Sequence, residues 1–101
     1  MIIGEGTIIE HGAMIKGPTI IGKNCEIRQS AYIRGNVIIG DESVIGHSTE
    51  VNNSVIFEKT EICHFNYVGS SVVARRAHMA AGAITSNLKL DASPISVKVG
   101  Q

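Results

Sequence analysis

The sequence predicts an all-β protein, a single-stranded parallel β-helix of about five coils built from six-residue repeats. Three observations predict it: the kinds of apolar residue, an apolar position that recurs every sixth residue, and a small residue at a fixed offset from it. The 101 residues include sixteen Ile and nine Val but only two Leu, beside eleven Gly. Because Ile and Val favour strands whereas Leu favours helices, this composition excludes a helical bundle.

An apolar residue occupies every sixth position along the first part of the chain. These positions are Ile3, Ile9, Ile15, Ile21, Ile27, Ile33, Ile39, Ile45, Val51 and Phe57. The residue four positions later is small or short in every unit, from Thr7 and Ala13 to Cys25 and Val55. A period of six fits a short strand and a tight turn, with both positions pointing inward. Three units then form one triangular coil, and the coils stack in parallel at a strand spacing of roughly 4.8 Å.

The repeat becomes irregular after Phe57. The next inward residues are expected at Ile62, Val68, Val73 and Met79, with five-residue units ending at Ile62 and Val73. These units bracket residues 62–73, and such irregularity marks either tolerated drift or a functional site. The repeat is expected to end near Asn87. Residues 1–87 would then form the β-helix, and residues 88–101 a C-terminal strand or loop tail.

Charge and cysteine content exclude several classes of protein. Nine Lys and Arg balance nine Asp and Glu, so the net charge is zero and no nucleic-acid or anionic-membrane surface is expected. There is no apolar run of membrane-spanning length and no signal-peptide pattern at the N-terminus. The two cysteines, Cys25 and Cys63, form no CxxC motif, which favours a reducing compartment, the cytoplasm. Cys25 falls at an inward small position and is expected in the core.

Stacking of the coils predicts two columns of polar residues. One contains His11, Gln29, His47, His64 and Ala81, and the other contains Lys16, Arg34, Asn52 and Gly69. His47 and His64 should be neighbours on adjacent coils, either as solvated corner residues or as metal ligands. The histidine pattern of trimeric β-helix proteins of the gamma carbonic anhydrase type needs a histidine where Asn52 stands, so no bound metal is expected. Arg34 beside the Asn52 amide suits an anion such as phosphate.

The C-terminal part of the repeat carries a more specific resemblance. Residues 64–72 read His-Phe-Asn-Tyr-Val-Gly-Ser-Ser-Val, and residues 80–87 read Ala-Ala-Gly-Ala-Ile-Thr-Ser-Asn. They resemble the left-handed parallel β-helix of the hexapeptide acyltransferases. The segment is most similar to the C-terminal domain of bifunctional sugar-1-phosphate nucleotidylyltransferase/glucosamine-1-phosphate N-acetyltransferases. The resemblance implies a left-handed homotrimer that acetylates the amine of an amino-sugar 1-phosphate with acetyl-CoA, for nucleotide-sugar synthesis.

The resemblance also implies roles for individual residues. His64 falls on the catalytic base. The sugar-phosphate contacts fall on Arg34, Tyr67 and Asn87, and Asn52 occupies the phosphate site where the family has a lysine. Ala81 and Gly82 fall where the backbone meets the acetyl group. Ala81 also follows His64 in the column predicted from the stacking of the coils, so it is expected directly above His64.

The implied chemistry is direct acyl transfer. His64 would accept a proton from the sugar amine, and backbone N–H groups near Ala81 and Gly82 would stabilise the oxyanion. No covalent intermediate is needed, and the sequence suggests no Ser or Cys beside a base. Cys63 adjoins His64, but neighbours on a strand point to opposite sides, which argues against a Cys–His pair.

Two other functions remain open. One is a non-catalytic trimerisation or regulatory β-helix module of a sugar-phosphate nucleotidyltransferase, and the other is a metal-dependent hydratase. The family domain follows a nucleotidyltransferase domain and continues for several further coils. The chain is therefore expected to be truncated relative to the family, an enzyme in its parent protein and not necessarily active alone.

Overall fold

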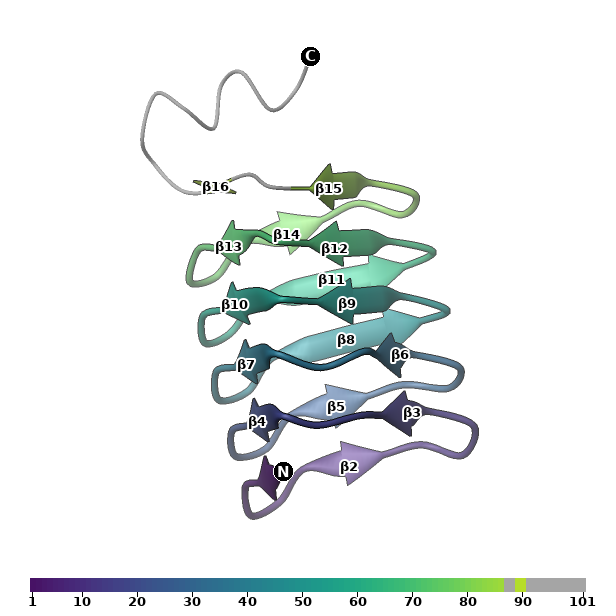
Figure 1. Ribbon diagram of the computed structural model, residues 1–101, viewed down its shortest axis with the longest axis vertical. Coiled ribbons are helices and arrows are strands. Elements are labelled where there is room, and N and C mark those ends of the chain that lie inside the picture. The colour runs from purple at the N-terminus through teal and green to yellow at the C-terminus, as the bar shows by residue number, and fades with distance from the viewer. Residues whose placement is uncertain (87–88, 91–101) are drawn as a thin grey trace.

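The chain forms a three-sided stack of parallel coils, seen side-on in Figure 1. The structure is a computed structural model, and it describes residues 1–86 and 89–90. All elements in these residues are strands. Within these residues no helix is long and apolar enough to cross a membrane. The all-β parallel β-helix expected from the repeat is confirmed.

Each sheet forms one face of the stack, and every third strand belongs to the same face. Face A consists of β1 (Ile2–Ile3), β4 (Thr19–Ile21), β7 (Val37–Ile39), β10 (Ser54–Ile56), β13 (Val72–Val73) and β16 (Lys89–Leu90). Face B consists of β2 (Ile8–Ile9), β5 (Glu26–Ile27), β8 (Val44–His47), β11 (Glu61–His64) and β14 (His78–Met79). Face C consists of β3 (Met14–Ile15), β6 (Tyr32–Ile33), β9 (Glu50–Asn52), β12 (Tyr67–Gly69) and β15 (Ile84–Ser86). The turns between faces are named the AB, BC and CA corners.

The coil is left-handed. In Figure 1 the chain climbs from the N-terminus at the bottom, and the paler strands at the back, such as β5, run from left to right. The strands at the front, such as β6, return from right to left. Seen from above, a climbing chain therefore turns clockwise, which defines a left-handed helix. This hand is the one implied by the acyltransferase resemblance.

The core is a ladder of stacked aliphatic side chains. The fully buried members include Ile21, Ile27, Ile33, Ile39, Ile45, Val51, Ile56, Ile62, Val68 and Val73. Cys25 is also buried, at 1% exposure, as expected from its small inward position. Ile3 and Ile9 are each 40% exposed, because they lie in the first coil and only the coil above packs against them.

The first irregular unit of the repeat is one unit earlier than the sequence predicts. Ile56 is fully buried whereas Phe57 is 47% exposed, so the five-residue unit runs from Val51 to Ile56. The inward small residue is accordingly Ser54, and Val55 points outward beside Ile38. The predicted inward positions of Phe57 and Val55 are therefore wrong.

The two short units lie at the same corner. Both shorten the CA corner, first between β9 and β10 and then between β12 and β13. Consequently Ile20 pairs with Ile38, eighteen residues later, whereas Val55 pairs with Val72, seventeen residues later. Since two successive coils are each one residue shorter at the same corner, the strands of face A remain in register.

Candidate functional site

The predicted histidine column exists at the BC corner. His47 and His64 are Cα partners on β8 and β11, which confirms that they lie on adjacent coils. The backbone continues the column on both sides. The Ser48 N–H donates to the Gln29 carbonyl oxygen at 3.2 Å, and the Gly82 N–H donates to the His64 carbonyl oxygen at 3.2 Å. The turn that contains Ala81 and Gly82 therefore lies directly on His64.

The imidazole rings of His47 and His64 differ in their hydrogen bonds. His47 is held through both nitrogens, Nδ1 to the Gln29 carbonyl oxygen at 2.9 Å and Nε2 to the Ser48 hydroxyl at 3.2 Å. The nitrogens of His64 make no hydrogen bond with another described residue, so its imidazole is accessible to an incoming group. The described residues contain no group of three or more side chains arranged to hold a metal ion.

Phe65 joins the two histidines. Its ring meets the His47 ring edge-on at 5.4 Å and the His64 ring at 5.3 Å between centroids. The backbone of Phe65 has φ 54°, a left-handed conformation that is uncommon for a bulky side chain. Its side chain is nevertheless 60% exposed. Sequence reasoning missed Phe65, although an aromatic residue at a turn position filled elsewhere in this column by Ser or Gly is a visible signal.

Asn66 fixes the turn above His64. Its side chain is buried, and Nδ2 donates to the carbonyl oxygens of Ala80 at 2.7 Å and Ala83 at 3.1 Å. These two carbonyls bracket Ala81 and Gly82. Asn66 is therefore a positioning residue for the turn, and the sequence reasoning missed this role.

The turn itself is open to a ligand. Ala81 and Gly82 are exposed, and a Cβ built on Gly82 would meet nothing within 4 Å. The Gly82 N–H is already bound to the His64 carbonyl oxygen, so it is not free for the oxyanion-stabilising role expected of it. Ala81 is a donor at this turn whose N–H has no backbone partner among the described residues.

Tyr67 and Asn52 lie together on face C. The Asn52 Nδ2 donates to the Tyr67 hydroxyl oxygen at 2.8 Å. The Tyr67 ring lies over Gly69, where a Cβ would be 2.5 Å from the hydroxyl. Tyr67 therefore extends along face C, away from the BC corner that carries His64 and toward the opposite end of the face, where Asn52 ends β9.

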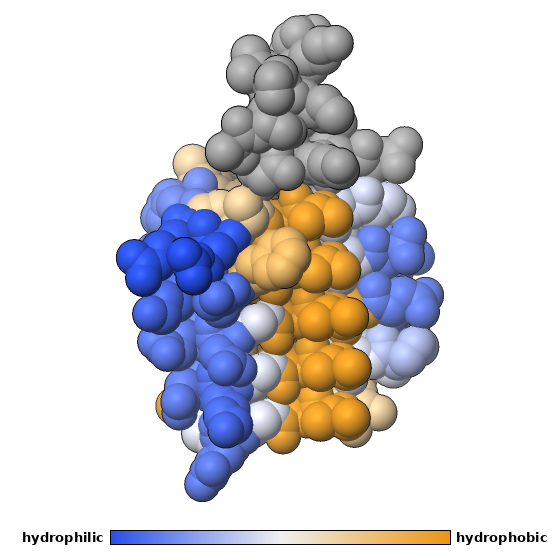
Figure 2. All heavy atoms as spheres, turned by 90° about the vertical axis from the view of Figure 1, so that its left-hand side faces the viewer, coloured by the Kyte–Doolittle hydropathy of each residue, from blue (hydrophilic) through white to orange (hydrophobic). Residues whose placement is uncertain are grey.

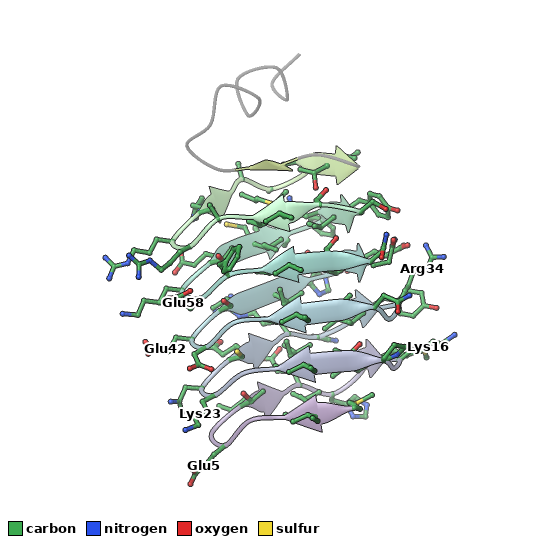
Figure 3. All side chains as sticks on the ribbon, turned by 60° about the vertical axis from the view of Figure 1, so that its left-hand side comes forward. Glu5, Lys16, Lys23, Arg34, Glu42 and Glu58 are labelled. Atoms are coloured by element: carbon green, nitrogen blue, oxygen red, sulfur yellow. The ribbon has the colours of Figure 1, made fainter. Side chains whose placement is uncertain are left out.

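Arg34 is paired with a carboxylate. Its Nη1 lies 2.8 Å from Glu50 Oε2, and both side chains are exposed. The hydrogen bond and the charge of Glu50 raise the pKa of the Arg34 guanidinium above its ordinary value, so Arg34 remains cationic. Figure 3 shows Arg34 and Lys16 at the same edge of the stack. The expected phosphate site thus contains a negative charge, the Glu50 carboxylate, in addition to the predicted residues.

A second cluster of reactive side chains lies on face B. The Cys63 Sγ is 3.2 Å from His78 Nε2, and His78 Nδ1 is 3.1 Å from Glu61 Oε1. The expectation that no cysteine lies beside a base is therefore wrong, because the base comes from the next coil and not from His64. The register supplies the signal: Glu61 is the Cα partner of His78, which brings the side chain of His78 to the cysteine two residues beyond Glu61.

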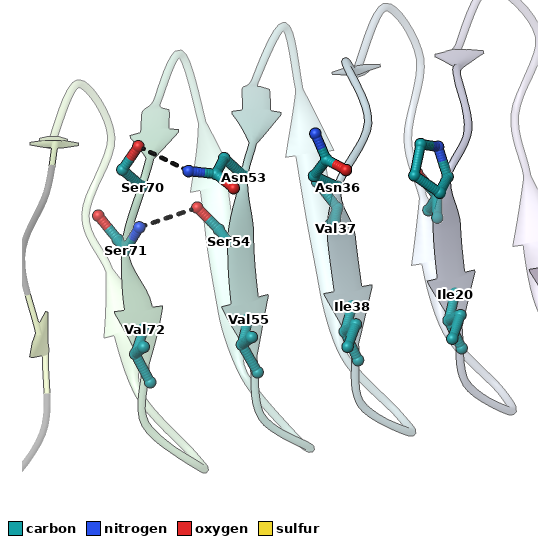
Figure 4. A pocket seen from close by; sticks show the side chains of 12 residues that line it. Ile20, Asn36, Val37, Ile38, Asn53, Ser54, Val55, Ser70, Ser71 and Val72 are labelled. Atoms are coloured by element: carbon teal, nitrogen blue, oxygen red, sulfur yellow. Dashed lines mark hydrogen bonds between the residues drawn. The ribbon is translucent and has the colours of Figure 1, made fainter.

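Face A carries a neutral groove. Its volume is about 600 Å³, and none of its twelve lining residues is charged. Ile20, Ile38, Val55 and Val72 form its apolar floor, and Asn36, Asn53 and Ser70 form one rim (Figure 4). Figure 2 shows the apolar stripe along this face, with a hydrophilic band beside it. The groove lies on a different face from Tyr67 and the Cys63 cluster.

Two expectations concern residues outside those described. Asn87, expected as a sugar-phosphate contact, is one of them. The C-terminal tail lies outside them too, apart from Lys89 and Leu90, whose strand pairs with β13.

Comparisons with known proteins agree with the predicted resemblance. The chain is 43% identical over 98 residues to the putative uncharacterized acetyltransferase YaiX of Escherichia coli strain K12, across 97% of this chain and 43% of YaiX. It is 38% identical over 50 residues to the bifunctional protein GlmU of Methanococcus maripaludis strain C5, across 50% of this chain and 12% of GlmU. It is 42% identical over 50 residues to the bifunctional sugar-1-phosphate nucleotidylyltransferase/acetyltransferase of Sulfurisphaera tokodaii, again across 50% of this chain and 12% of that protein.

The aligned regions therefore span less than half the length of these relatives. The expected similarity to bifunctional nucleotidylyltransferase/acetyltransferases is confirmed. A family match covers most of the chain, from residue 15 to residue 99, and its description is GMPPB C-terminal domain. Together with the parallel β-helix, this match shows that the chain belongs to the GMPPB C-terminal domain family.

Proposed function

We propose that the chain is an N-acetyltransferase domain that transfers an acetyl group from acetyl-CoA to the amine of an amino-sugar 1-phosphate. The proposal rests on one contact, the hydrogen bond from the Gly82 N–H to the His64 carbonyl oxygen. This contact joins the residue that fits a general base to the open turn that fits the acetyl group. The names of YaiX and of the Sulfurisphaera tokodaii relative, both of which include the word acetyltransferase, support the class of reaction.

In the proposed reaction, bound acetyl-CoA supplies an electrophilic thioester carbonyl. His64 accepts the proton of the sugar amine as the amine attacks, because its imidazole is exposed and neutral imidazole is a base near neutral pH. The Ala81 N–H donates to the oxyanion. Asn52, Tyr67 and Arg34 bind the sugar phosphate at the far end of face C, and Asn87 completes this contact in the proposal.

A matched pair of histidine variants tests this function. Acetylation of glucosamine 1-phosphate by the full chain with acetyl-CoA is followed by mass spectrometry of the sugar product. His64→Asn is expected to lower kcat/KM about a hundredfold, the scale of the loss of a general base. His11→Asn, at the same corner in the first coil, is the control and should match the wild type. Equal rates for His64→Asn and the wild type would contradict the proposal.

The groove on face A supports a second candidate function, a self-associating β-helix module that forms a homotrimer. An exposed apolar stripe along a whole face is unusual for a monomer. Ile20 and Ile38 are 45% and 47% exposed within it. Because the groove has no charged lining residue, a second copy of the same neutral stripe is its best-matched occupant.

Sedimentation tests self-association through this face. The wild-type chain should sediment as a trimer. Ile38→Glu should sediment as a monomer, since a carboxylate would be buried in the contact. Ile8→Glu places the same change on face B, at a residue that is 60% exposed, and should leave the trimer intact. A wild-type chain that sediments as a monomer would refute self-association through this face.

A further inference from the structure

The cluster on face B has the connectivity of a nucleophilic triad. Cys63 Sγ contacts His78 Nε2 at 3.2 Å, and His78 Nδ1 contacts Glu61 Oε1 at 3.1 Å. Each group thus contacts the next through the atom that a thiol–imidazole–carboxylate relay requires. Three side chains from two adjacent coils converge here, with Glu61 and Cys63 on β11 and His78 on β14.

Glu61 determines the tautomer of His78. A carboxylate oxygen accepts hydrogen bonds, so the His78 nitrogen that faces it, Nδ1, carries the proton. Nε2 of the neutral ring is then the basic nitrogen, and it faces the thiol. His78 can therefore accept the Cys63 proton without a change of rotamer. The nitrogens of His64, by contrast, make no hydrogen bond with a described residue that would orient its ring.

The thiol is accessible to a reagent from solution. Cys63 is partly exposed. It lies between Gly46 and Ala80, since Ile62 pairs with Ile45 below and Met79 above. These neighbours present only a hydrogen and a methyl group beside the sulfur. His78 and Glu61 are 59% and 62% exposed, so no bulky side chain covers the cluster.

The other cysteine provides an internal reference. Cys25 is buried at 1% exposure, and its Sγ lies 3.2 Å from the Gly40 carbonyl oxygen. A carbonyl accepts a hydrogen bond but does not act as a base toward a thiol. The chain therefore contains one thiol beside a base and one beside an inert acceptor.

We propose that Cys63, His78 and Glu61 form a second reactive site, at which Cys63 accepts an acyl group from an acyl thioester. Cys63 Sγ attacks the thioester carbonyl carbon, and its proton passes to His78 Nε2. The donor carbon–sulfur bond breaks, and the leaving thiolate takes the proton from His78. The products are S-acyl-Cys63 and the free donor thiol, so the exchange needs no oxidant or other co-reactant.

The choice of a thioester as the electrophile rests on the proposed function, whereas the reactivity of the thiol rests on the cluster alone. The site is also separate from the transfer assigned to His64, which needs no covalent intermediate. Acyl uptake at Cys63 would hold an acyl group on the protein itself.

The first experiment tests whether His78 acts as a base toward the Cys63 thiol. The reduced full chain is treated with iodoacetamide, and peptide mass spectrometry follows Cys63 and Cys25 separately. Because exposure alone favours Cys63, the decisive comparison is between the wild type and His78→Asn. Alkylation of Cys63 should slow about tenfold in His78→Asn and about threefold in Glu61→Gln, while Cys25 is unaffected. If both variants fold by circular dichroism and Cys63 reacts at the wild-type rate, the triad is refuted.

The second experiment measures acyl uptake. The chain is incubated with phenyl thioacetate, a small donor that needs no cofactor groove, and separately with acetyl-CoA. Hydroxylamine-labile acetyl should appear on Cys63 and be absent in Cys63→Ser. Failure of both donors overturns the acyl-acceptor role.

The two proposals fail in distinguishable ways. Acetyl-Cys63 without any acetylation of glucosamine 1-phosphate would support this site and contradict only the proposed function. Sugar acetylation without acetyl-Cys63 would contradict this site alone.

Discussion

The Asn52 side chain donates a hydrogen bond to the Tyr67 hydroxyl oxygen across two adjacent coils, with Nδ2 and Oη 2.8 Å apart. The two residues are fifteen positions apart in sequence, and the register that pairs Asn52 with Gly69 brings them together. Since the Tyr67 oxygen accepts this bond, its own O–H remains free to donate. The pair therefore presents one fixed hydroxyl donor at the end of face C where Arg34 projects.

Tyr67→Phe should weaken binding of glucosamine 1-phosphate about tenfold, because the lost hydroxyl would donate to a charged phosphate. The free energy of unfolding should fall by less than about 1 kcal/mol, since water can replace the hydroxyl as the partner of Asn52. Calorimetric titration measures the first effect and urea denaturation the second. Tyr32→Phe is the matched control, because both tyrosines are Cα partners of Glu50 on face C. Equal binding by the two variants would exclude Tyr67 from the site.

Glu50→Gln should strengthen phosphate binding. The Glu50 carboxylate now neutralises Arg34 at 2.8 Å and would repel an incoming phosphate. Its removal is expected to tighten binding of glucosamine 1-phosphate about fivefold at low ionic strength, and the gain should vanish near 1 M salt. Calorimetry at two salt concentrations measures both effects. Glu26→Gln is the control, because Glu26 pairs with Arg28 at 3.1 Å on face B. Weaker binding by Glu50→Gln would show that Arg34 needs its partner to be positioned.

The repeat alone predicts the fold and the stacking of His64 beneath Ala81. The coil between these two residues contains one five-residue unit, which ends at Val73, and the sequence places that unit where the structure has it. The repeat cannot locate the first shortened unit, since Ile56 and Phe57 are both apolar and either satisfies the hydrophobic pattern. The length of the CA corner decides between them. In the sequence, this shorter corner appears only as two residues, Asn52-Asn53, where the preceding coils have three.

Contacts on the outer faces are harder to predict. Arg34–Glu50 and Cys63–His78 join residues sixteen and fifteen positions apart, so they lie diagonally across neighbouring coils and not within one column. The reach and rotamer of each side chain determine such contacts. The hydrophobic periodicity of the sequence carries no information about the reach or the rotamer of an outward-facing side chain.

Phe65→Asn should make the protein more stable and less active. Asn accepts a positive φ more readily than Phe, and Asn24, Asn36 and Asn53 already do so at other corners. Because the Phe65 ring is 60% exposed, little burial is lost, and the free energy of unfolding should rise by about 0.5–1 kcal/mol. Sugar acetylation should fall about tenfold, since the His64 ring loses its packing partner.

Urea denaturation and kcat/KM of the same preparation measure both effects of Phe65→Asn. Ser30→Asn places the same residue at the same corner position, with φ 64° in the wild type, and should change neither quantity appreciably. A less stable Phe65→Asn variant with full activity would contradict a functional role for the ring.

Asn66→Ala should separate the positioning of the turn from the stability of the fold. Ala31 and Thr49 occupy the equivalent inward position in lower coils, so alanine fits the column. The two carbonyls that Asn66 binds keep other donors, Ala80 O from the Ala83 N–H and Ala83 O from the Tyr67 N–H. The free energy of unfolding should therefore fall by only about 1 kcal/mol. KM for acetyl-CoA should rise about tenfold, because the turn at Ala81 loses the amide that fixes it.

Thr49→Ala is the control for Asn66→Ala. Thr49 lies one coil below, and its buried hydroxyl oxygen has no hydrogen-bond partner among the described residues. Removing it should leave stability unchanged or slightly raised, and KM unchanged. Urea denaturation and steady-state kinetics of both variants measure the difference. A shift in KM of the same size in the two variants would mean that Asn66 acts through general packing of the coil and not through the Ala80–Ala83 turn.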